Sequence, residues 1–203
     1  MNRSLLLILC LVPCLSNAGG TSWTVPDSSL ELALGYRFNF FPSSLLESVF
    51  SETMPIRAHG VGLELLSKKQ SFLLFLNVQH DFSAIKDGVW VDFEGESKHS
   101  EIDLSMTSAE FGLGFDIALP GTPVSLTLGG GIGIGVLSGS LHLVSTDPEI
   151  IYDEYKPIPP ILPILHLFIA PKFTIAHCAA LRVEFGFRDL FYVGLSGALV
   201  LPR

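Results

Sequence analysis

The chain has 203 residues, of which 48% are hydrophobic and only 16% are charged, and its formal net charge is −8. A soluble domain usually has about 25% charged residues, so this composition argues against an ordinary soluble surface, and the length allows one domain or two small ones. The acidic balance argues against nucleic acid as a partner, because phosphate binding needs clustered Lys and Arg side chains.

The first 18 residues have the three parts of a secretory signal peptide. Arg3 supplies a short basic region, residues 5–12 form an apolar region, and residues 16–18 place small side chains before a cleavage site after Ala18. We therefore expect residues 1–18 to be removed and residues 19–203 to form the mature domain.

Two alternatives at the N-terminus are a membrane anchor and a lipoprotein signal. The apolar run is too short to span a bilayer as a helix, and Pro13 stands before Cys14 where a lipoprotein signal has a small residue. Removal of Cys10 and Cys14 with the signal would leave only Cys178 in the processed chain, for which no intrachain disulfide is expected.

Apolar residues occupy alternate positions in most of the remaining chain. In residues 30–40 the even positions from Leu30 to Phe40 are leucines and aromatics, and the odd positions include Glu31, Arg37 and Asn39. Strand side chains alternate between two faces, so this pattern predicts a strand with one apolar face. The same pattern predicts strands at residues 60–65, 74–82, 109–119, 165–175, 181–187 and 191–201.

Residues 124–136 contain glycine at every second position from Gly129 to Gly135. A helix would be destabilised by about 0.5–1 kcal/mol for each glycine relative to alanine. The segment lacks both the G-x-G-x-x-G spacing of a dinucleotide loop and the lysine of a P-loop. We interpret it as an eighth strand with one apolar face and one bare face.

The connections alternate between long and short. Residues 42–56, 83–101 and 145–160 form long loops, tight turns lie between them, and the last connection, near Asp189, is also short. Long loops on one side and tight turns on the other are typical of membrane barrels. The sequence thus predicts an all-β fold, an eight-stranded antiparallel up-and-down transmembrane β-barrel. Shifts in the alternation at residues 106–109 and 137–141 are interpreted as bulges or as strands that continue into loop hairpins.

A soluble sandwich is the alternative fold. Against it, the apolar faces are rich in Phe and Leu, and the opposite faces carry glycine and charge. In lipid, every backbone polar group must be satisfied internally, which closure of the sheet achieves.

The polar faces are expected to point into the lumen, which in an eight-stranded barrel is just wide enough to be filled by side chains. Charges of both signs can pair there, and we expect them to form a structural plug rather than a transport path. Glycines at positions 60, 62, 112, 114, 129, 131, 133 and 135 would leave room for the long side chains. The predicted network comprises Glu31, Arg37, Glu64, Asp81, Glu110, Asp116, Lys172, Arg182 and Glu184, with Arg188 as a further candidate.

Within this network, one specific ion pair is expected. A tight turn near Cys178 would place Lys172 opposite or nearly opposite Glu184, with Arg182 beside them.

No catalytic or metal site is expected. His80 and Asp81 point to opposite faces of a strand, and Ser140 and His142 share a face without an acid in phase. The six histidines lack the spacing of metal ligands, so we expect neither an enzyme nor a cofactor. An acidic group in the loop could bind Ca²⁺ weakly, but a solvated loop is favoured; it comprises Asp87, Asp92, Glu94, Glu96 and Glu101.

The signal peptide, the eight alternating strands, the short turns and the paired-charge lumen resemble the small outer-membrane barrels of the OmpA-type transmembrane domain. The resemblance is architectural, covers residues 28–201, and implies a Gram-negative-type cell outer membrane with lipid, lipopolysaccharide and the barrel-assembly machinery as partners. Such barrels usually end in an aromatic residue, whereas this chain ends in LVLPR.

Two functions are consistent with a small outer-membrane barrel. The first is a structural or surface-interaction barrel whose long surface-exposed loops contact an extracellular ligand. The alternative is a narrow, porin-like channel for small ions or hydrophobic molecules.

Overall fold

The fold is known from a computed structural model that describes residues 25–42, 56–91, 97–145, 153–156, 160–175 and 178–202. Within these ranges the secondary structure consists of nine strands, and no helix is long and apolar enough to cross a membrane. The strands are β1 (Ser28–Phe40), β2 (Arg57–Lys69), β3 (Phe72–Val91), β4 (Ser97–Ala118), β5 (Val124–Ser145), β6 (Asp153–Lys156), β7 (Ile161–Ile175), β8 (Ala179–Arg188) and β9 (Leu190–Pro202).

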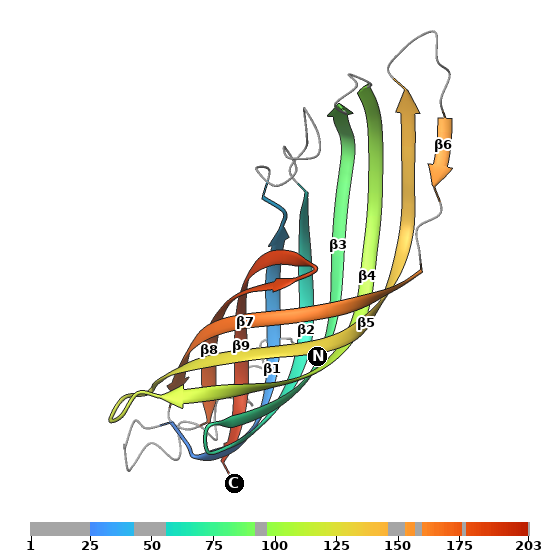
Figure 1. Cartoon of the computed structure of the whole chain (residues 1–203). Helices are drawn as coiled ribbons and strands as arrows, with labels where there is room; N and C mark the ends of the chain where they lie inside the picture. Colours follow the sequence, from blue (N-terminus) through green and yellow to red (C-terminus); the bar gives the residue numbers. More distant parts are fainter. Residues whose placement is uncertain are drawn as a thin grey trace, which may run out of the picture.

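Eight of these strands close into an antiparallel barrel (Figure 1). Each strand pairs with its sequence neighbour, and β1 pairs with β9 from Ser29↔Pro202 to Phe40↔Phe191, which closes the ring. β5 pairs with β4 on one side, and on the other with β7 at its lower part and with β6 at its upper part. The predicted all-β eight-stranded barrel is confirmed, with β6 as a short addition.

The alternation of faces follows the sequence. On β2, Val61, Leu63 and Leu65 are 47%, 52% and 40% exposed, whereas Glu64 between them is 5% exposed. The glycine-rich segment is indeed a strand, with Ile132 and Ile134 on its outer face. An apolar outer surface with a polar interior is the arrangement that a barrel needs in lipid.

The glycines of β4 and β5 give room to aromatic side chains inside the barrel. A Cβ atom at Gly112 would overlap the ring of Phe75 and the carbonyl oxygen of Gly130, and one at Gly129 would overlap the ring of Phe168. The sequence predicted that these glycines leave room for long charged side chains. That is so at Gly133, where a Cβ would overlap Glu110, but at Gly112 and Gly129 phenylalanine rings occupy the space.

The connections contain more strand than the sequence predicts, and β6 (Asp153–Lys156) lies within the predicted loop 145–160. Most of residues 83–101 are strand rather than loop, because β3 and β4 continue as a paired hairpin up to Val91 and Ser97. Of the two interpretations of the shifts at residues 106–109 and 137–141, strand continuation is correct: the β4–β5 register runs without a shift from Lys98↔Ser145 to Ala118↔Ser125. A register shift instead interrupts the β3–β4 pairing between Ile85 and Gly88.

The rim of the barrel is therefore uneven. β3, β4 and β5 have 20, 22 and 22 residues, whereas β8 has 10 and turns directly into β9 at Asp189, which has a φ of 58°. Figure 1 shows β3–β6 rising well above the β8–β9 hairpin.

The predicted signal peptide lies outside the described residues. Cys178, in the turn between β7 and β8, is disulfide-bonded in the full-length chain. The prediction that the chain without residues 1–18 has no intrachain disulfide is a separate statement and stays a prediction.

Candidate functional site

The interior of the barrel contains all ten charged residues that the sequence analysis considered, including Arg188. Each is at most 6% exposed. Together with Lys68, they give five basic side chains and six carboxylates among the described residues, so the interior is nearly balanced in charge. The balance matters because a buried charge without a partner is costly.

One group of charges, here called the Lys172 cluster, comprises Glu31, Lys68, Asp116 and Lys172 near the turn side of the barrel. The Lys172 ammonium lies 3.0 Å from Glu31 Oε1 and 2.7 Å from Asp116 Oδ2, and Lys68 Nζ lies 2.9 Å from the same Asp116 oxygen. The Thr127 hydroxyl donates to the other oxygen of Asp116 at 3.1 Å. Both Asp116 oxygens therefore have polar partners.

Phe75 and Phe168 form an aromatic layer in the interior. The rings of Phe75 and Phe168 meet edge to face, with centroids 5.5 Å apart. The guanidinium of Arg182 lies 5.9 Å from the centroid of the Phe168 ring. Such contacts add to the packing of the interior.

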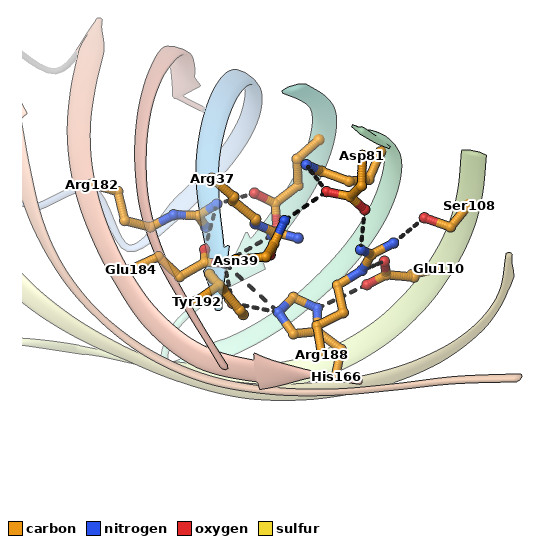
Figure 2. Close-up of polar contacts among 12 residues, drawn as sticks. Arg37, Asn39, Asp81, Ser108, Glu110, His166, Arg182, Glu184, Arg188 and Tyr192 are labelled. Atoms are coloured by element: carbon orange, nitrogen blue, oxygen red, sulfur yellow. Dashed lines mark hydrogen bonds and ion pairs between the residues drawn. The ribbon is translucent and has the colours of Figure 1, made fainter. Parts of the chain in front are cut away.

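A second group, here called the central network, links strands around the barrel (Figure 2). It comprises Arg37, Glu64, Asp81, Glu110, His166, Arg182, Glu184, Arg188 and Tyr192. Glu184 accepts from Arg37 Nη2 at 2.8 Å and lies 3.2 Å from Arg182 Nη2. Arg182 also binds Glu64, and the Arg37 guanidinium lies 4.7 Å from the centroid of the Tyr192 ring. Charge-assisted hydrogen bonds of this kind are stronger than neutral ones.

His166 and Tyr192 connect the two halves of the central network. The Tyr192 hydroxyl donates to Glu184 and lies 2.6 Å from His166 Nε2, while His166 Nδ1 lies 2.9 Å from Glu110 Oε2. His166 and Tyr192 are 0% and 2% exposed. A continuous polar chain thus runs from Glu184 on β8 to Glu110 on β4.

Arg188 ends the network on the loop side. Its Nε donates to Glu110, its Nη1 to Asp81 at 2.6 Å, and its Nη2 to Ser108. Asn39 Nδ2 donates to the other oxygen of Asp81 at 3.0 Å. One guanidinium therefore holds two carboxylates and a hydroxyl, a geometry suited to arginine.

The predicted Lys172–Glu184 pair is wrong. Lys172 is opposite Arg182 in the β7–β8 register, and its ammonium binds Glu31 and Asp116 instead. Glu184 does lie between two cations, as predicted, but they are Arg37 and Arg182. The error arises because a long lysine side chain reaches across the lumen rather than along its own hairpin.

Three buried polar residues of the interior, Lys68, His166 and Tyr192, were not among those predicted from the sequence. His166 and Tyr192 stood on the inward faces of their predicted strands, so the alternation already contained the signal. Lys68 was missed because the predicted strand ended at residue 65, whereas β2 extends to Lys69 and keeps even-numbered residues inward.

Of the other candidate residues, the structure describes the side chains of His80 and Asp81. His80 is on the outer face, where its Nδ1 lies 2.9 Å from the Thr107 hydroxyl, while Asp81 points inward, as predicted. No group of three or more potential metal ligands occurs among the described residues. The side chains of Ser140 and His142 lie outside the described part, as do those of Asp87, Asp92, Glu94, Glu96 and Glu101.

Asp189 occupies the turn between β8 and β9, outside both strands. Burial raises the pKa of its carboxyl group, and the backbone N–H of Leu165 and the charge of Arg188 oppose this shift. The N–H of Leu165 lies 3.4 Å from Oδ1, whereas the buried Oδ2 has no hydrogen-bond partner among the described residues.

Comparisons with known proteins place the chain by its fold. No family model matches it, and neither does any curated protein. Among solved structures, it is similar to Ail, the attachment invasion locus protein of Yersinia pestis, with a TM-score of 0.52 and 11% identity over 86% of this chain and 99% of that one. It is also similar to Neisserial surface protein A, with a TM-score of 0.48 and 8% identity over 86% and 97% of the two chains. Both are small eight-stranded outer-membrane barrels, and the resemblance is architectural.

Proposed function

We propose that the chain is an integral protein of the cell outer membrane, with a closed lumen and a structural or surface-interaction role on its loop side. The observation that carries this proposal is the combination of an apolar outer surface with an interior that ion-paired side chains fill at the level of the central network. An outer surface of this kind favours lipid as its surroundings. The architectural likeness to Ail supports the same location.

The packing of the interior supports a closed lumen. The cavity beside Arg37, Glu64, Arg182 and Glu184 has a volume of about 20 Å³, which is enough for about one water molecule. The Phe75 and Phe168 rings pack directly against His166 of the central network, with centroids 5.9 and 5.0 Å from that of the imidazole. The charges are thus better suited to holding the strands together than to conducting ions.

The location and orientation can be tested with inserted epitope tags. A tag at Gly95, between β3 and β4, should be labelled by an impermeant antibody on intact cells. A matched tag at Gly121, in the turn between β4 and β5, should be labelled only after the outer membrane is opened. Gly121 suits the insertion because a Cβ there would meet no atom within 4 Å. Labelling at Gly121 on intact cells would invert the orientation, and recovery of both tagged proteins in the soluble periplasm would contradict the membrane proposal.

The closed lumen predicts a lack of conductance. The refolded protein in planar bilayers should give no steps above background. The double variant Phe168→Ala, Arg182→Ala removes a ring and a guanidinium from the interior and should give measurable conductance steps. It serves as the positive control for an open lumen. Regular conductance steps from the unmodified protein would favour the alternative function, a narrow channel. Mobility shifts between boiled and unboiled samples check that both proteins are folded.

A further inference from the structure

A cavity of about 320 Å³ lies at the loop-side end of the barrel, above the central network. Its volume is at the lower end of the roughly 300–1,000 Å³ range of small-molecule sites. Side chains from β2, β4, β5, β7 and β9 make its wall almost entirely apolar, among them Ala58, Leu104, Met106, Leu137, Leu162 and Leu190.

The base of the cavity is polar and incompletely satisfied. Asn39, 3% exposed, lines the cavity and donates to Asp81 through Nδ2, but its Oδ1 has no hydrogen-bond partner among the described residues. The buried Oδ2 of Asp189 is likewise without a partner there. A buried polar atom that lacks a partner costs about 1–3 kcal/mol, so both acceptors favour a ligand that donates hydrogen bonds.

The charge of the cavity lining determines which kind of hydrogen-bond-donating ligand fits best. The charged residues of the cavity are Arg188, Asp81 and Asp189. Arg188 is already bound to Asp81, Glu110 and Ser108. The carboxylate of Asp189 therefore gives the base a net negative charge, which favours a cationic head over a neutral or acidic one.

We propose that this cavity binds a single alkyl chain with a primary ammonium head, the head at Asn39 and Asp189 and the chain along the apolar wall. A chain of about ten non-hydrogen atoms, at roughly the 30 Å³ that one water molecule occupies in the liquid for each atom, fits within the volume of the cavity. An ammonium group has three donors and no acceptor, which matches two acceptors without partners. The proposal concerns only the loop-side end and does not depend on whether the lumen conducts.

Photo-crosslinking tests this proposal on the full chain in phosphatidylcholine vesicles. The probe is decylamine with a diazirine in the middle of its chain, and mass spectrometry locates the labelled residues. We expect saturable labelling of wall residues such as Leu104, Met106 and Leu162. Decylamine should compete at a concentration about tenfold lower than decanol or decanoate, as expected for a charge-assisted hydrogen bond.

Four variants separate binding in the cavity from partition into lipid. Ala58→Trp should fill the cavity and abolish the saturable labelling, whereas Leu63→Trp, on the outer face of the same strand, should preserve it. Asp189→Asn should keep the labelling but remove the preference for decylamine over decanol. Asparagine tolerates the positive φ of this position. Leu162→Trp serves as a second filling variant if Ala58→Trp does not fold, as judged by its gel mobility.

Each other outcome overturns the proposal. Labelling confined to outward-facing residues, or labelling that excess decylamine does not reduce, would show partition into the bilayer. A lack of any saturable labelling in the unmodified protein would show that the cavity is inaccessible, for instance because the chain's own loops fill it. Stronger competition by decanoate would assign the base to an acidic head.

Discussion

Replacement of Arg188 by methionine should lower the free energy of unfolding by about 3–5 kcal/mol, because removal of one partner leaves buried charges uncompensated. Arg188 is 3% exposed and binds Glu110, Asp81 and Ser108, so its loss leaves two carboxylates without their common cation. The measurement is urea unfolding of the protein refolded in lipid vesicles, followed by gel mobility.

A control and a rescue variant make this result specific. Lys69→Met, at an exposed position at the end of β2, should change the free energy of unfolding by less than about 0.5 kcal/mol. Adding Glu110→Gln and Asp81→Asn to Arg188→Met should restore part of the loss, since the unpaired charges are removed. A loss below about 1 kcal/mol for Arg188→Met alone would show that the network contributes little to stability.

A double-mutant cycle should couple Lys172 to Asp116 and leave Lys172 uncoupled from Glu184. Lys172→Met alone should cost about 3–5 kcal/mol. In combination with Asp116→Asn, the loss should fall short of the sum of the two single losses by at least about 1 kcal/mol, as for residues in contact. The contact is direct, at 2.7 Å between Lys172 Nζ and Asp116 Oδ2.

The second arm of the cycle combines Lys172→Met with Glu184→Gln. Among the described residues, the two side chains share no ion-pair partner, because Lys172 binds Glu31 and Asp116 while Glu184 lies with Arg37 and Arg182. Their losses should add within about 0.5 kcal/mol. Strong coupling in this arm, without coupling to Asp116, would contradict the register of β7 and β8.

The sequence predicts the barrel well because the period of two is a local property. Each strand from residue 30 to residue 201 shows its apolar outer face by its own alternation, and tight turns such as residues 119–123 make consecutive strands antiparallel. The inward set followed from the same alternation, which is why all the predicted charged residues lie in the interior.

The partners of the inward charges could not be predicted in the same way. They depend on the register around the barrel and on which side chains meet across the lumen. Lys172 and Glu31 are 141 residues apart in sequence, and Arg37 and Glu184 are 147 apart. The prediction placed Lys172 beside Glu184 because it considered only the hairpin that joins their strands. A long side chain inside a narrow barrel has neighbours on strands that its sequence does not indicate.

The uneven rim means that closure protects the sheet only over part of its height. β2 pairs with β3 up to His59↔Phe82, and beyond that pair β3 continues to Val91 alongside β4. Among the described residues, no strand pairs with the other side of β3 at this level. A bilayer needs only about 9–11 residues of each strand, so roughly ten residues of β4 and β5 remain for a four-stranded open sheet with β3 and β6. In its described part, the chain is thus an edgeless ring at one level and a sheet with an unpaired β3 edge at the next, where protection from edge-to-edge association must come from something other than closure of the barrel.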